Sequence, residues 1–246
     1  MDMTDGRGRA LAMAAVLSVV LAGCGGSGTV EPRASAPSAT PSPMPDEATT
    51  PFPYSTEPVA VEPGTYEIQS SAWSVTDFTV TFPEDWTVQY GNVYASNTDE
   101  DDEFGFYAVV VDGIYADACD GETGHVMDVG PSVDDLATAL LQQPGPMASG
   151  PVETTLGGHP ATRIDLTIPE GFDLEACSFG GIGLQIWYSP PPADQYFVLL
   201  ADGIASVYIV DVDGQRQVFL TQLRSVTSDD DIAELQSVLD SVQLEE

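Results

Sequence analysis

Basic side chains are scarce in this chain, and lysine is absent altogether. The 246 residues include 39 acidic residues but only 6 basic ones, so the formal net charge is −33 at pH 7. A charge of this sign repels the phosphates of nucleic acids and the headgroups of anionic lipids. The composition therefore excludes DNA and RNA as partners. It also means that any membrane association must come from an anchor rather than from the protein surface.

Histidine and cysteine are also rare, which leaves few residues for metal or nucleophilic chemistry. The chain has two histidines, His125 and His159, and three cysteines, of which none are spaced as C-x-x-C. It also lacks an H-E-x-x-H helix, a phosphate-binding loop and a dinucleotide-binding glycine pattern, and its expected domain has no G-x-S-x-G elbow. We therefore expect no cofactor, no metal site and no catalytic residue. The many acids leave a catalytic carboxylate pair as the alternative.

The N-terminus carries the features of an export signal. Arg7 and Arg9 precede the apolar stretch Ala10–Ala22, which is shorter than the ~20 apolar residues needed to span a bilayer. The sequence Leu-Ala-Gly-Cys at 21–24 resembles the bacterial lipobox, in which the cysteine is acylated and the preceding signal is removed. This resemblance implies two or three lipid chains on Cys24 that hold the protein at the outer face of the cell membrane. Simple secretion and an uncleaved anchor are the alternatives.

The composition divides the chain into three parts. Residues 1–23 form the expected lipoprotein signal peptide. Residues 24–63 are rich in Pro, Ser, Ala and Thr and lack apolar periodicity, so they predict a disordered tether. Residues 64–246 are long enough for a single domain with a core of its own.

Two cysteines remain once Cys24 is assigned to lipidation. In an exported chain, Cys119 and Cys177 are expected to form a disulfide. Closing the long loop between them would stabilise the domain by roughly 4 kcal/mol in an entropic estimate.

Alternating apolar and polar residues after residue 63 predict a series of short strands. The Gly157–Gly158 and Asp213–Gly214 pairs predict two hairpin turns within the series. The predicted strands cover residues 78–82, 86–90, 104–111, 152–156, 161–168, 182–188, 197–200, 207–212 and 217–223.

Two segments show helical spacing instead. Ser132 and Ser228 are each followed three residues later by an aspartate, a pattern typical of a helix N-terminus. Apolar residues then recur on one face, up to about Pro144 in the first segment and Val242 in the second. Together with the strands, these helices predict an α+β domain in which amphipathic helices pack on an antiparallel sheet.

Three sequence segments suggest a family. The runs Val129–Leu136 and Leu156–Arg163, and Asp211–Gly214 with the terminal helix after it, resemble those of exported lipoproteins of actinobacteria. The domains of these lipoproteins are similar to the PsbP/Mog1-like sandwich. The resemblance covers roughly residues 64–246 and implies that sandwich fold and an extracytoplasmic location. It implies no catalytic residues.

Two further groups of residues could bind a ligand. The acidic run at 99–103 could gather a cation such as calcium, although a solvated hairpin tip is the favoured interpretation. Several aromatic residues could line a binding surface, but Trp86 and Trp187 are expected in the core because strand aromatics usually face inward. The aromatic candidates are Trp73, Trp86, Tyr90, Trp187, Tyr188 and Tyr196.

These observations predict a membrane-anchored envelope lipoprotein. We expect it to be non-catalytic and to bind a protein, glycan or lipid partner outside the cytoplasm. The alternatives are an extracellular hydrolase with a carboxylate site and a purely structural surface protein.

Overall fold

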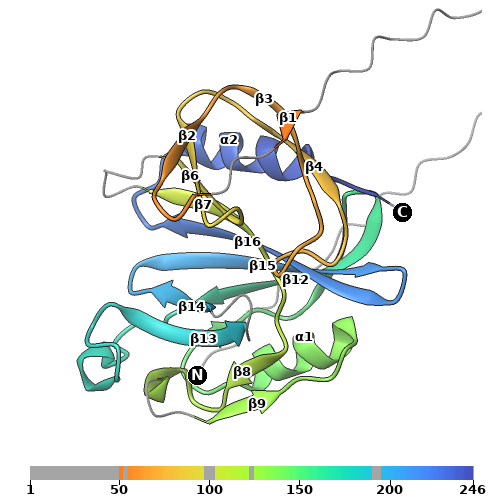
Figure 1. Cartoon of the computed structure of the whole chain (residues 1–246). Helices are drawn as coiled ribbons and strands as arrows, with labels where there is room; N and C mark the ends of the chain where they lie inside the picture. The colour runs from red at the N-terminus through yellow and green to blue at the C-terminus, as the bar shows by residue number, and fades with distance from the viewer. Residues whose placement is uncertain (1–49, 52–54, 97–102, 122–124, 190–194, 246) are drawn as a thin grey trace, which may run out of the picture. The chain divides into compact units, whose positions relative to one another are not determined.

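The computed structural model describes residues 50–51, 55–96, 103–121, 125–189 and 195–245. Cys24, the expected signal peptide and most of the expected tether lie outside these residues. Within the described part of the chain, 47% of residues are in strands and 16% in helices. The strands form three sheets, and two α-helices pack against them (Figure 1).

A nine-stranded antiparallel sheet lies at the centre of this domain. Its strand order is β10-β12-β15-β16-β7-β6-β5-β2, and β11 pairs with β12. The strands are β2 Val59–Val61, β5 Trp86–Gln89, β6 Val93–Ser96, β7 Phe104–Val109, β10 Met147–Ala148, β11 Val152–Leu156, β12 His159–Thr167, β15 Gly203–Val212 and β16 Gln215–Arg224.

One face of the central sheet is covered by a four-stranded sheet and by α2 (Asp229–Asp240). The sheet order is β1-β3-β4-β17, comprising Thr50–Pro51, Gly64–Ile68, Phe78–Phe82 and Gln243–Leu244. The core on this face is aromatic. Phe219 of β16 stacks on Phe106 with ring centroids 5.6 Å apart and contacts Phe78 edge-on. We call this the first core.

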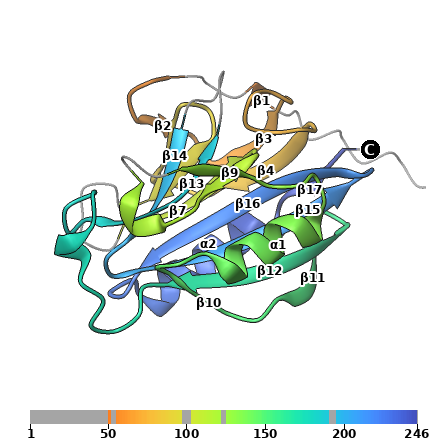
Figure 2. The same ribbon diagram turned by 90° about the horizontal axis from the view of Figure 1, so that it is seen from below.

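The opposite face is covered by a second four-stranded sheet and by α1 (Val133–Gln142). The sheet order is β14-β13-β8-β9, comprising Gln195–Leu200, Gly183–Ser189, Gly113–Tyr115 and Val126–Asp128. Figure 2 shows α1 lying across the central strands on this side. The core here is mainly aliphatic, and we call it the second core. Two 3-10 helices, Ala118–Asp120 and Leu174–Ala176, lie in the adjoining loops.

The central strands are apolar on both faces because both faces are covered. In β15, Val207 and Ile209 belong to the second core, whereas Tyr208 and Val210 belong to the first. Successive side chains of a strand point to opposite faces, so a continuous apolar run is what two cores require.

Both predicted hairpin turns are confirmed. Gly157 and Gly158 have φ values of 59° and 86°, and Asp213 and Gly214 have φ values of 52° and 83°. Two consecutive positive φ angles match the right-handed twist of the flanking strands, which is why glycine and aspartate occupy these positions.

Both predicted helix starts are confirmed as well. Ser132 Oγ accepts a hydrogen bond from the Asp135 N–H at 3.1 Å, and the Asp135 carboxylate accepts one from the Ser132 N–H at 3.0 Å. This reciprocal pair is a capping box. Ser228 caps α2 in a similar way by accepting from the Asp231 N–H at 3.2 Å.

The predicted α+β class, by contrast, is wrong. The described residues form a β-rich domain with only two α-helices, rather than a sheet dominated by packed helices. The PsbP/Mog1-like sandwich implied by the resemblance is corrected with it. The prediction underestimated the strand content because it missed eight short strands. Each is two to five residues long, which is too short to show a clear alternation of apolar and polar residues. The unpredicted strands are β1, β2, β3, β6, β8, β9, β10 and β17.

Two of these strands also bear on where the domain begins. β1 and β2 both precede residue 64, within the segment expected to be a tether, and β2 pairs with β5. Paired structure therefore begins before residue 64.

The described part of the chain contains no helix long and apolar enough to cross a membrane.

Candidate binding cleft

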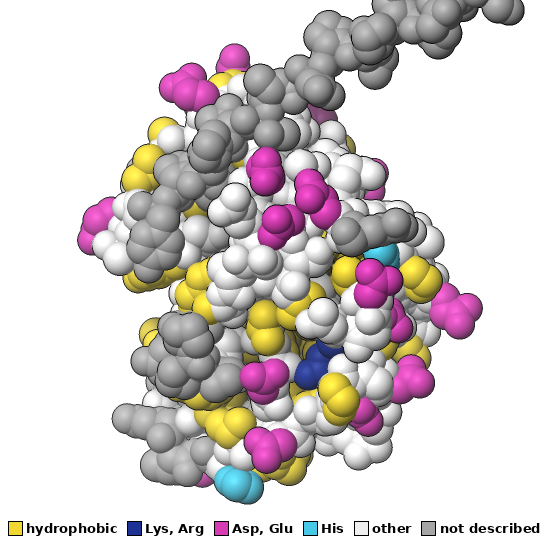
Figure 3. Space-filling model, turned by 45° about the vertical axis from the view of Figure 1, so that its right-hand side comes forward, with side chains coloured by type: hydrophobic (Ala, Val, Ile, Leu, Met, Phe, Trp, Pro, Cys, Tyr) yellow, Lys and Arg dark blue, Asp and Glu magenta, His cyan; other side chains and the backbone are white. Residues whose placement is uncertain are grey.

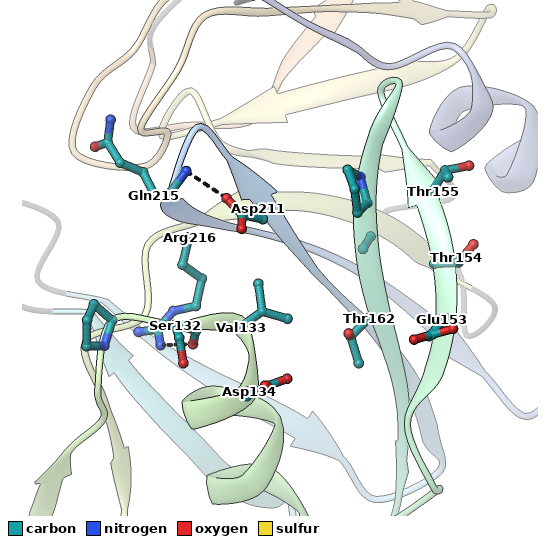
Figure 4. Close-up of a pocket in the computed structure, with 14 residues that line it drawn as sticks. Ser132, Val133, Asp134, Glu153, Thr154, Thr155, Thr162, Asp211, Gln215 and Arg216 are labelled. Carbon is teal, nitrogen blue, oxygen red and sulfur yellow. Dashed lines mark hydrogen bonds between the residues drawn. The ribbon is translucent and has the colours of Figure 1, made fainter.

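A cleft of about 680 Å³ opens at one end of the central sheet, beside the N-terminus of α1 (Figure 4). It is built from segments that are far apart in the sequence. They are residues 131–134 at the start of α1, 153–155 of β11, 160–162 of β12, 211 of β15, and 214–216 at the β15–β16 turn.

Strand register aims a set of polar side chains into this cleft. Thr162 pairs with Glu153, and Asp211 pairs with Arg216. Thr162 shares its face of β12 with Ile164, which is fully buried in the second core. The polar side chains therefore lie on the same face of the central sheet as the second core, at the end of the sheet that α1 does not cover.

Arg216 fixes the wall of the cleft. Its Nη1 donates to the carbonyl oxygens of Gly130 and Ser132, and its Nη2 donates to the carbonyl of Val111. The guanidinium thus ties the chain before α1 to strand β16. Burial lowers the pKa of Arg216, whereas the nearby carboxylates of Asp112 and Asp135 raise it. Most of its donors are committed to the protein itself, so Arg216 positions the cleft rather than offering a free cationic group.

The capping box stabilises the same wall. Hydrogen bonds from Ser132 lower the pKa of Asp135, and the Arg216 charge lowers it further. The carboxylate of Asp135 is turned back onto the helix start, so it is not part of the cleft lining.

The rim of the cleft is acidic and rich in hydroxyl groups. The exposed carboxylates are Asp134, Glu153 and Asp211, and one oxygen of Asp211 accepts a hydrogen bond from the Gly214 N–H at 2.7 Å. Threonine hydroxyls are supplied by β11 and β12. Figure 3 shows a basic side chain within a hollow of the surface, with acidic groups around it. Such a rim suits a ligand that donates hydrogen bonds or carries positive charge.

The predicted disulfide is confirmed. Cys119 and Cys177 are joined with an S–S distance of 2.07 Å and a Cα–Cα distance of 4.6 Å. Ser178 strengthens the junction, because its N–H and its hydroxyl both donate to the Cys119 carbonyl, at 2.9 and 3.2 Å. The bond joins two loops beside the β14-β13-β8-β9 sheet, and neither cysteine lines the cleft. Cys24, the predicted lipidation site, lies outside the described residues.

The two histidines lie in different parts of the domain. His125 is exposed and precedes β9, whereas His159 begins β12 and pairs with Leu156 across the hairpin. Among the residues that the structure describes, no cluster of three or more His, Cys, Asp or Glu side chains could hold a metal ion.

The aromatic candidates divide between core and surface. Trp86 and Trp187 are buried, as predicted. Trp73, Tyr90 and Tyr188 are half-buried. Tyr196 is 52% exposed and contacts the ring of Phe179 edge-on at 5.9 Å.

Most of the acidic run at 99–103 lies outside the described residues. Glu103, its last member, is half-buried. Burial raises the pKa of Glu103, although the Arg224 charge opposes the shift. The Asp211–Gly214 segment forms the hairpin turn predicted for it.

The sequence did not identify the residues of the cleft as a binding site, although Ser132 and the Asp211–Gly214 turn were predicted as local structural features. Glu153, Thr155, Thr162 and Arg216 are ordinary polar residues on strands, with no motif spacing of their own. A signal did exist at the level of segments, because the three runs that carry the family resemblance all contribute to the cleft lining.

Comparisons with known proteins add little. No protein-family model matches the chain, and no curated protein matches it. Among solved structures, the chain is similar to the crystal structure of LpqN, described as involved in cell envelope biogenesis of Mycobacterium tuberculosis. The two share 11% identity over 77% of this chain and 91% of that one, with a TM-score of 0.35. A similarity this distant supports no argument about fold or function.

Proposed function

We propose that this chain is an exported, lipid-anchored protein of the cell envelope that binds a partner outside the cytoplasm. The Leu-Ala-Gly-Cys sequence ending at Cys24 supports export and anchoring. The cleft at the end of the central sheet supports binding, and it is the single observation that carries the proposal. The proposed role is binding rather than catalysis.

Anchoring is tested by the Cys24→Ala variant expressed in an actinobacterial host. The variant should appear in the medium or remain as the unprocessed precursor, because acyl chains supply the membrane affinity. The parent should fractionate with membranes and shift to the detergent phase. If the variant fractionates with membranes as the parent does, the anchor is not at Cys24.

Binding at the cleft is tested by site-specific photo-crosslinking in the lipidated, full-length protein. A photoreactive residue replaces Thr162 in the cleft, and a matched control replaces Ser237, which is exposed on α2 against the opposite face of the central sheet. A discrete adduct at position 162 that is absent at 237 supports the proposal. Equal labelling at both positions, or none at either, contradicts it.

A further inference from the structure

Strand β11 is an unpaired edge of the central sheet. Among the described residues, Val152–Leu156 pairs with β12 and with no other strand. Leu156 and His159 flank the two-residue turn, and Thr155 lies opposite Pro160, which has no N–H. In a hairpin with a two-residue turn, the pair that flanks the turn is hydrogen-bonded, and bonded and non-bonded pairs then alternate along the strands. Thr155 and Glu153 therefore occupy non-bonded positions. Their own N–H and C=O groups therefore point away from β12, toward the open edge.

The same two residues line the cleft, and Figure 4 shows the Glu153 side chain extending toward Thr162. Glu153 and Thr155 are both exposed and both line it, and Glu153 lies across the strand pair from Thr162. A polypeptide that adds to this edge would hydrogen-bond to the backbone of β11. Its alternate side chains would then lie on the same face as the acidic rim.

Charge selects the occupant. The net charge of −33 disfavours a second copy of this chain, whose β11 would bring its own Glu153 to the same edge. Carboxylates at Asp134, Glu153 and Asp211 instead favour a basic segment. We propose that an extended, basic segment of a partner protein adds to β11 as an extra strand, with lysine or arginine side chains directed at this rim. The inference rests on the proposed function of the cleft and specifies the partner.

The test measures binding of short synthetic peptides to the purified full chain by fluorescence anisotropy. An alternating lysine–threonine peptide should bind, and a glutamate–threonine peptide of equal length should not. A lysine–proline peptide carries the same charge as the first but lacks half of the backbone donors, so it should bind about tenfold or more weakly. Hydrogen exchange should slow at the amides of Glu153 and Thr155 when the lysine–threonine peptide is present. Equal binding of the two basic peptides would overturn strand addition, because charge alone would then explain the affinity.

Two variants locate the site. Glu153→Lys should weaken the lysine–threonine peptide about tenfold or more, because it replaces an attraction with a repulsion. Thr155→Pro removes one outward N–H at an edge position that tolerates proline, and it should weaken binding about fivefold. The matched control is Glu170→Lys, an exposed position beyond the opposite end of β12, which should leave the affinity unchanged. Equal losses at positions 153 and 170 would contradict the assignment.

The outcomes separate this inference from the proposed function. If the basic peptide fails to bind while crosslinks at position 162 persist, strand addition is wrong and the cleft remains a binding site for another ligand. Binding of an isolated envelope polysaccharide at the cleft, in place of peptide, has the same meaning. If both the peptide and the crosslinks fail, both proposals are wrong.

Discussion

At the end of the central sheet where β15 and β16 turn, one face is closed and the other is open. On the first-core face, Val210 and Gln217 are fully buried, and the Gln217 side chain accepts a hydrogen bond from the Val75 N–H at 2.8 Å. On the opposite face, the adjacent residues Asp211 and Arg216 are exposed and half-buried, respectively. The same strand ends therefore complete a core on one side and build a cleft on the other. The proposed binding at this end would use the part of the second-core face that α1 leaves uncovered.

The first core should be the most sensitive region to truncation. Phe219→Ala removes a ring that stacks on Phe106 at 5.6 Å and contacts Phe78 at 5.3 Å. We expect a loss of about 3–5 kcal/mol in the free energy of unfolding, measured by denaturant titration. Thr162→Ala in the cleft should lose less than about 1 kcal/mol. Similar losses for the two variants would mean that the two faces do not differ as described.

The second-core side of the domain also contains a covalent bond, the Cys119–Cys177 disulfide. Replacing Cys119 and Cys177 together by serine should lower the free energy of unfolding by about 2–5 kcal/mol, because the unfolded chain is no longer constrained. Thermal unfolding with and without reductant provides the check. Reductant should lower the midpoint of the parent and leave the double variant unchanged. An insensitive parent would show that the bond does not contribute.

The smallest effect on stability is expected at Asp165, which lies on β12 on the first-core face of the central sheet. Burial tends to raise the pKa of Asp165, but hydrogen bonds from Arg163 and Ser206 outweigh it, so the pKa lies below its usual 3.8. The carboxylate therefore stabilises the fold above the unfolded-state pKa, and this contribution is lost as the pH falls through the lowered folded-state value. Asp165→Asn should flatten the acid limb of stability measured between about pH 5 and pH 2.

Arg163→Met provides the matched test of that cause, because Arg163 donates two hydrogen bonds of 2.8 Å to Asp165. It should flatten the same limb, and the double variant should add little to either single change. An additive double variant would assign the pH dependence to some other group.

Local features were predicted well from the sequence. The capping residues Ser132 and Ser228 and the turns at Gly157 and Asp213 each act within a few residues, so the chemistry of one segment was enough to identify them. The pairing of Cys119 with Cys177 was also predictable, because the expected lipidation of Cys24 left these two cysteines as partners for each other.

Features set by long-range pairing were not predicted. Strands such as β8 and β17 are two or three residues long and exist because a neighbouring strand accepts them. Because these strands were missed, the sequence analysis overestimated the share of helix in the domain. The cleft was missed for a related reason: Glu153 and Arg216 lie 63 positions apart in the numbering, and only the sheet register brings them to one face.

The pairing of β17 with β4 has a consequence for how the domain is made. Gln243 and Leu244 pair with Thr79 and Phe78 in an antiparallel ladder, and Leu244 is part of the first core. If the chain is exported from its N-terminus onward, as proposed, the first core cannot close until β17 has crossed the membrane. Under that proposal, the aromatic strands would stay open during export or be shielded by other proteins. C-terminal truncations should therefore impair maturation more strongly than their length alone would indicate.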